Sequence, residues 1–345
     1  MKTLFILSLF QQGYKIKVST LYHLLKGKRT VSVLMNGFLF DNLSYFHLFP
    51  ELNEKTFHQL LQKLIKNGFI SFDQESLEAQ ITDKGTQYLL ENAEIIRTHT
   101  KHLNGYSYAK TENDMWRMLQ FLVQVTSHLS YQNKQYIPLE ASPYYQLKIK
   151  QLLVTLDKNR VGHLMTEEWR TVLSQFPEKE GNFIAQQFSG YRLNGKAEQQ
   201  LLQESSAFQR LLYRKNIYHQ LFSCIERLPQ GAVLYETIKS DLEKNKNQSM
   251  LQTKELWLAG HSLSEITQLR QMKPSTVNDH FLELAISEKD FLGEPFIPQE
   301  QVNIFQEIKT LCQTWQYAEL RQRFEIDYFA FRMYQIMQIK KEREY

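Results

Sequence analysis

Lysine and glutamine side chains recur at helical spacing in one segment near the start of the chain. Residues 54–67 have the apolar spacing of an amphipathic helix, and the opposite face of that helix would carry Lys55, Gln59, Gln62 and Lys66, with His58 and Lys63 beside them. Lysine neutralises DNA phosphates, and glutamine can pair with the edge of an adenine. The face therefore predicts a contact with DNA, and an ordinary solvated helix face is the alternative.

A basic turn precedes that helix. Lys26, Lys28 and Arg29 surround Gly27, and we expect them to contact DNA phosphates. Residues 1–70 hold nine Lys/Arg against three Asp/Glu residues, which leaves +6, whereas the whole chain carries +4. Positive charge confined to one segment of an otherwise balanced protein is typical of contact with a polyanion.

The segment 253–287 predicts a helix-turn-helix. Gly260 can end the first helix in a left-handed conformation, and Ser262 with Glu265 has the spacing of a capping box at the start of the second. Pro274 suits the first turn of the third helix, which in helix-turn-helix proteins enters the major groove. The candidate DNA contacts around the start of this third helix are Lys273, Ser275, Thr276 and Asn278.

Acidic residues oppose DNA binding by this third helix. Asp279 and Glu283 lie on it, and the stretch 239–290 holds seven basic and eight acidic residues. DNA phosphates would repel both carboxylates unless these accept hydrogen bonds from cytosine amino groups. The alternatives are that the fold serves as a scaffold, or that the third helix contacts a protein.

No residue pattern indicates catalysis or a bound metal. His99 and His102 are three positions apart, but no cysteine or acidic cluster accompanies them. The sequence contains no Walker lysine loop, GxGxxG fingerprint or GxSxG elbow. Carboxylates such as Glu112 are expected to be solvated. We therefore expect a protein that is not an enzyme, with no catalytic residues, no cofactor and no metal.

The composition favours a mainly α-helical protein with one small β element. The 345 residues include 13 glycines and 8 prolines, and apolar residues recur mostly at helical period. The two cysteines, Cys224 and Cys312, lie far apart in the sequence and suit a reducing compartment. No apolar run is long enough for a membrane span. We expect a cytoplasmic protein without membrane contact, and association with the nucleoid is left open.

Breaks in the apolar pattern divide the chain into three expected parts. These are a winged-helix-like domain at 1–98, a helical middle domain at 110–238, and a helix-turn-helix domain with C-terminal helices at 248–345. A charged stretch at 242–249 is expected to be the linker before the third part.

Several features are expected inside these parts. The first part should contain strands at 69–72 and 77–81 and a helix that begins at residue 82, an order typical of a winged helix. The middle part should contain loops at 131–143, around Gly181 and at 190–195. The apolar segment 324–339 is expected to be either a core helix or a surface for a partner.

Three strings resemble one family. YHLLKGKRTVSVL (22–34), FHLFPEL (46–52) and the segment 253–286 are similar to the YpbB-type helix-turn-helix proteins of low-GC Gram-positive bacteria, which are typically encoded beside a RecQ-type helicase. The C-terminal segment also resembles the helix-turn-helix appended to many RecQ helicases. The resemblance implies a helicase accessory role in DNA repair or DNA replication, and it supplies no catalytic residues.

Three functions remain open at this point. The first is a DNA-binding accessory protein whose partners are DNA and a RecQ-type helicase or another replication or repair protein. The second is a protein-interaction adaptor without direct DNA contact, which the acidic balance of 239–290 favours. The third is a transcription regulator, although no dimer seam and no basic recognition helix are evident. The oligomeric state is left open.

Overall fold

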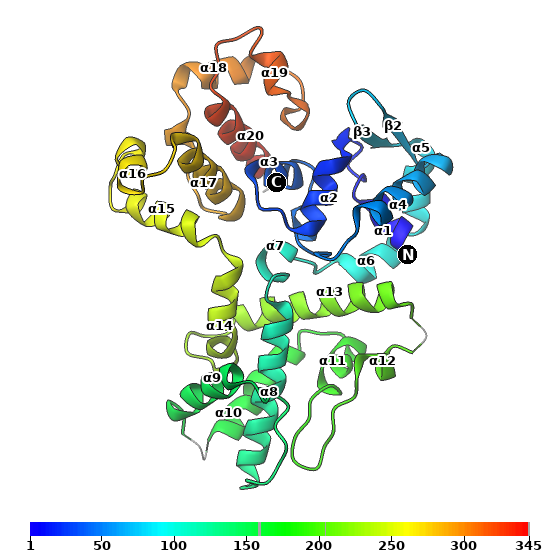
Figure 1. The fold of residues 1–345 in the computed structure, drawn as a ribbon, viewed down its shortest axis with the longest axis vertical. Helices are drawn as coiled ribbons and strands as arrows, with labels where there is room; N and C mark the ends of the chain where they lie inside the picture. Colours follow the sequence, from blue (N-terminus) through cyan, green and yellow to red (C-terminus); the bar gives the residue numbers. More distant parts are fainter. Residues whose placement is uncertain (158–159, 204, 344–345) are drawn as a thin grey trace. The chain divides into compact units, whose positions relative to one another are not determined.

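The computed structural model describes residues 1–157, 160–203 and 205–343, and it shows a mainly helical protein with one small sheet (Figure 1). The chain divides into two compact units. The terminal unit contains Lys2–Asn92 and Asn247–Tyr345, and the middle unit contains Ala93–Lys246. The predicted mainly α fold with a C-terminal helix-turn-helix is confirmed. No helix among the described residues is long and apolar enough to cross a membrane.

The first half of the terminal unit has the element order of a winged helix. Its elements are α1 (Lys2–Ser8), β1 (Ile16–Lys17), α2 (Val18–Lys26), α3 (Val31–Leu39), η1 (Leu43–Tyr45), α4 (Glu54–Lys66), β2 (Ile70–Asp73), β3 (Glu78–Ile81) and α5 (Asp83–Glu91). The three strands pair antiparallel in the order β1-β3-β2, with Ile16 opposite Ala79 and Ile70 opposite Ile81. The predicted hairpin is therefore present, and β1 is an additional strand.

The second half of the terminal unit contains the helix-turn-helix and the helices that cover it. These elements are α15 (Gln248–Leu258), α16 (Leu263–Leu269), α17 (Pro274–Ser287), η2 (Glu294–Phe296), α18 (Gln299–Glu307), η3 (Cys312–Thr314), α19 (Tyr317–Leu320) and α20 (Tyr328–Arg343). Gly260 adopts φ 90° after α15. The Ser262 hydroxyl and the Glu265 carboxylate form the predicted capping box.

Aromatic side chains fill the core of this half. Phe281 of α17 packs edge-on against Trp257 of α15, with ring centroids 5.5 Å apart, and lies 4.8 Å from Phe296. Phe331 and Ile336 of α20 are fully buried. The segment 324–339, predicted as either a core helix or a partner surface, is therefore a core helix from Tyr328 on.

The middle unit is built from helices. They are α6 (Ala93–Thr100), α7 (Gly105–Tyr108), α8 (Glu112–Ser130), α9 (Pro143–Val154), α10 (Val161–Leu173), α11 (Glu178–Ala185), α12 (Glu198–Leu201), α13 (Ala207–Glu226) and α14 (Val233–Asn245). The apolar face of α8 packs against α10, α13 and α14 around one buried core.

Two local predictions for this region are corrected by the structure. Gly181 lies inside α11 rather than in a loop, because one glycine costs a helix only about 1 kcal/mol. The expected linker at 242–249 is mostly helical, since α14 continues to Asn245 and α15 begins at Gln248. Only Lys246 and Asn247 separate the two helices, and the two compact units meet in sequence between these residues.

Candidate nucleic-acid interface

The α4 helix separates its apolar and polar residues as the sequence predicts. Asn53 caps its start, because the Asn53 side-chain oxygen accepts a hydrogen bond of 2.8 Å from the Lys55 N–H. Phe57, Leu61 and Leu64 are buried on one side of the helix. The polar side chains on the other side are all exposed: Lys55, Gln59, Gln62, Lys63 and Lys66.

The lysines of α4 are available for an external anion. Within the described part of the chain, Lys55, Lys63 and Lys66 form no ion pair. Glu54, in the first turn, lies 3.7 Å from the His58 ring instead. The helix immediately precedes the β2–β3 hairpin, which is the place of the groove-reading helix in a winged helix.

The hairpin itself carries negative charge. Asp73 accepts hydrogen bonds from the Glu75 backbone N–H at 2.9 Å and from the Ser76 hydroxyl at 2.9 Å. These bonds lower the pKa of Asp73, so the carboxylate stays ionised at neutral pH. Because Glu75 and Glu78 also lie in this hairpin, the hairpin would repel DNA phosphates. A contact with DNA should therefore involve the α4 face rather than the β2–β3 hairpin.

Of the three predicted phosphate contacts in the basic turn, two remain available and one does not. Gly27 ends α2 with φ 81°, and a side chain there would collide with His47, because a Cβ would lie 1.8 Å from His47 Nδ1. Lys28 is exposed and Lys26 is half-buried, so both side chains can still reach an anion. Arg29 instead donates from Nε to Glu283 Oε1 at 2.6 Å. Its guanidinium is therefore committed to a contact inside the terminal unit.

The third helix of the helix-turn-helix, α17, is mostly enclosed. It packs against α3, α15, α16 and α20, and Val277, Phe281 and Leu284 are fully buried. Of the candidate contacts, Lys273 and Ser275 are exposed, whereas Thr276 and Asn278 are half-buried. The exposed side chains of α17 therefore lie mainly in its first half, and residues 280–286 are closed to a partner.

Glu283 is buried, whereas the sequence predicted it to be an exposed acid of the third helix that DNA phosphates would repel. It is 3% exposed, and it accepts hydrogen bonds from Arg29 and, at 2.8 Å, from Asn247 Nδ2. Asp279 remains exposed, and partial burial together with the charge of Glu283 raises its pKa. The electrostatic objection to DNA contact by α17 therefore rests on Asp279 rather than on Glu283.

The middle unit holds a buried charged cluster that the sequence analysis missed. Glu112, expected to be solvated, is 2% exposed and accepts hydrogen bonds from Lys215 and, at 2.9 Å, from His219 Nε2. His219 Nδ1 accepts the Asn104 N–H at 2.9 Å, which fixes a neutral ring with its proton on Nε2. Burial lowers the pKa of His219. These partners are more than a hundred positions from Glu112, so no local signal could have revealed the cluster.

The geometry gives this cluster a structural role. Each member bonds to another member or to the backbone, and the charges of Glu112 and Lys215 compensate each other. Among the described residues, no group of three or more potential ligands could hold a metal ion.

These elements define a helix-turn-helix protein with a winged-helix-like module at its N-terminal end. Residues 249–335 match the family described as a helix-turn-helix domain. The chain is 24% identical over 335 residues to Protein YpbB of Bacillus subtilis (strain 168). The aligned region covers 94% of this chain and 93% of that protein. The chain is therefore similar to a YpbB protein over nearly its whole length, and its C-terminal part matches a helix-turn-helix domain. No solved structure matches it.

Proposed function

We propose that this protein is a non-enzymatic DNA-binding accessory protein that assists a RecQ-type helicase in DNA repair or replication. The helix-turn-helix domain suggests DNA binding, and the mostly helical fold points to a protein that is not an enzyme. The observation that carries the proposal is the α4 face, where Lys55, Lys63 and Lys66 are exposed beside two glutamines.

The α4 helix suits the major groove of duplex DNA. Its lysines would contact phosphates, and Gln59 and Gln62 lie between them, where amide groups can reach base edges. The exposed Lys28 would add a phosphate contact from the turn after α2. Lys273 and Ser275 at the start of α17 offer a second contact, because the first N–H groups of a helix favour an anion.

A salt titration of duplex binding by the full chain tests this proposal. Each phosphate contact that is lost should reduce the slope of log K against log salt by about 0.9, so the Lys63→Gln/Lys66→Gln double variant should lose about 2 from the slope. Lys309→Gln is the matched control, because Lys309 is exposed in the same unit but lies outside α4.

Two outcomes would contradict DNA binding through α4. One is that the unchanged protein does not bind duplex DNA at low salt. The other is that the Lys63/Lys66 double variant keeps the slope of the Lys309→Gln control.

A protein-interaction adaptor is the second candidate function. Leu258 at the end of α15 is 72% exposed, and Leu269 at the end of α16 is 58% exposed. These two side chains are the candidate contacts for a partner protein. A pull-down of a RecQ-type helicase should weaken with the Leu258→Ser/Leu269→Ser variant, while binding to duplex DNA stays unchanged. Retention of the helicase by this variant would count against the adaptor.

A further inference from the structure

An exposed aromatic ring is held in place at the C-terminal end of α8, in the middle unit. Tyr131 follows the last residue of this helix and is 65% exposed. Its ring stacks on that of Tyr191, with centroids 4.6 Å apart and planes 23° from parallel. A ring that is both fixed and exposed can stack on an incoming planar group with little loss of conformational entropy.

Backbone hydrogen bonds fix both tyrosines. After α8, Gln132 adopts φ 54°, and the Asn133 N–H bonds to the His128 carbonyl at 2.9 Å, as in a Schellman cap. On the other side, the Tyr191 N–H donates to Ser127 Oγ at 3.0 Å. This bond ties the loop that carries Tyr191 to α8, so the two rings are positioned by the same helix.

The two loops that carry these rings are basic. The loop between α8 and α9 and the loop between α11 and α12 include Lys134, Arg192 and Lys196. Their one carboxylate, Glu140, is buried and pairs with Arg117 at 2.6 Å. The Arg192 guanidinium lies 5.0 Å from the centroid of the Tyr191 ring, and both Lys134 and Arg192 are exposed. Exposed aromatic rings among cationic side chains are the combination by which proteins bind single-stranded nucleic acid.

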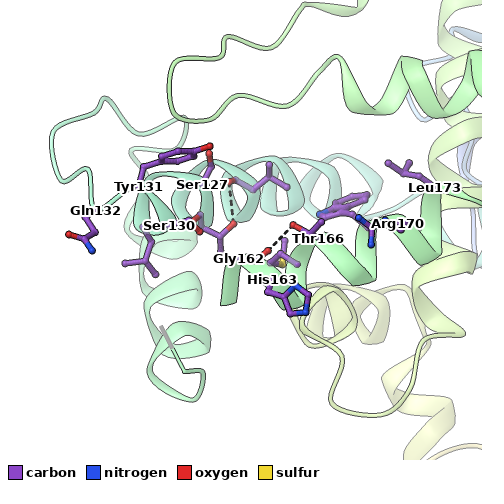
Figure 2. A pocket seen from close by; sticks show the side chains of 14 residues that line it. Ser127, Ser130, Tyr131, Gln132, Gly162, His163, Thr166, Arg170 and Leu173 are labelled. Carbon is purple, nitrogen blue, oxygen red and sulfur yellow. Dashed lines mark hydrogen bonds between the residues drawn. The ribbon is translucent and has the colours of Figure 1, made fainter. Parts of the chain in front are cut away.

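A pocket of about 910 Å³ adjoins Tyr131 between the end of α8 and α10. Figure 2 shows the side chains that line it, among them Ser127, Ser130 and Tyr131 from the end of α8 and His163, Thr166 and Arg170 from α10. The lining combines hydroxyl, imidazole and guanidinium groups, of which Arg170 pairs with Glu167 at 2.6 Å. The exposed His163 ring and the hydroxyl oxygens can bond to the polar edge of a base.

We propose that this surface binds single-stranded DNA. One base stacks on the exposed face of Tyr131, a neighbouring base enters the pocket beside it, and Lys134 and Arg192 contact the phosphates. A single strand fits because its bases are free to stack on protein side chains, whereas the bases of a duplex are stacked on each other. The site lies in the middle unit and does not involve α4, so it goes beyond the proposed duplex binding and does not depend on it.

The test measures binding of a fluorescently labelled oligothymidylate to the full chain at low salt by anisotropy. Loss of one base–aromatic stack should weaken the affinity of Tyr131→Ala by about 5- to 150-fold, whereas Tyr131→Phe keeps the ring and should bind nearly as the unchanged protein does. Arg192→Gln should lower the salt slope by about 0.7. Ile137→Ala, at a 90% exposed position of the same loop, is the control and should change nothing.

Three results would overturn this inference: no binding of the oligothymidylate by the unchanged protein, equal affinity of Tyr131→Ala and Ile137→Ala, or equal losses in Tyr131→Ala and Tyr131→Phe. The duplex assay separates this inference from the α4 proposal. Tyr131→Ala should bind duplex DNA normally, and the Lys63→Gln/Lys66→Gln variant should keep its affinity for the oligothymidylate.

Discussion

Replacing Arg29 by alanine should destabilise the terminal unit without removing a DNA contact. The Arg29 side chain is 23% exposed, whereas that of Glu283 is 4% exposed. Loss of one partner from a buried ion pair leaves an uncompensated charge and costs about 3–5 kcal/mol. Because water reaches part of Arg29, we expect the lower end, about 3 kcal/mol, which lowers the melting temperature of this unit by roughly 6–12 °C.

Calorimetry of the full chain provides the measurement. Only the transition of the terminal unit should move in Arg29→Ala, and the neighbouring Lys28→Ala should stay within about 0.5 kcal/mol of the unchanged protein because Lys28 is exposed. The double variant Arg29→Met/Glu283→Gln should recover part of the loss, since it leaves no buried unpaired charge. A loss below about 1 kcal/mol in Arg29→Ala would show that the pair does not hold α17.

The same two variants separate stability from DNA binding. Lys28→Ala should reduce the salt slope of duplex binding by about 0.9, and Arg29→Ala should leave it unchanged at temperatures where the variant is folded. If Arg29→Ala reduces the slope and Lys28→Ala does not, the assignment of Arg29 to the protein interior is refuted.

Two further predictions concern pH and capping. Burial lowers the pKa of His219 in the folded state, so the unfolded chain binds the extra proton first. The resulting stability of the middle unit is present above about pH 6.5 and is lost as pH falls below it. Urea unfolding at several pH values should show this loss, and His219→Gln should reduce it. His102, whose pKa burial lowers, contributes in the same window, and the carboxylates of Glu112 and Asp241, whose pKa values hydrogen bonds and neighbouring cations lower, contribute at more acidic pH. Ser262→Ala should cost the terminal unit about 1 kcal/mol in urea unfolding by removing the cap of α16, whereas Gln268→Ala on the exposed face of α16 should change it by less than about 0.5 kcal/mol.

The elements that the sequence predicted correctly are those whose signals are local. Ser262 and Glu265 are three residues apart, and Gly260 and Pro274 act on their own backbone conformation, so the helix-turn-helix could be placed without knowledge of the rest of the fold. The β2–β3 hairpin is local in the same way. The β1 strand was missed because it has only two residues and pairs with Ala79 and Glu78, far along the chain.

The contacts that the sequence could not predict join distant residues. Arg29 and Glu283 are 254 positions apart, and each is an ordinary charged residue in its own neighbourhood. Glu112 looks solvated for the same reason, since Lys215 and His219 lie on a helix far along the chain. Burial of a charge depends on what packs around it, and no spacing pattern reports that. The predicted three-part division stays a prediction, although the compact terminal unit contains most of both outer parts.

Ion pairs also change what the count of charged residues around the helix-turn-helix implies for DNA binding. Seven basic and eight acidic residues between 239 and 290 suggested an acidic surface. Two of these acids have buried side chains and cationic partners outside that stretch: Glu283 pairs with Arg29, and Asp241 pairs with Lys148 at 2.7 Å. Within the terminal unit, residues 247–290 hold four bases and six acids, so once Glu283 is paired with Arg29 four bases face five acids and the region stays slightly acidic. A phosphate contact at the exposed start of α17 therefore depends on Lys273 itself, and Asp279 limits how far along the helix such a contact can extend.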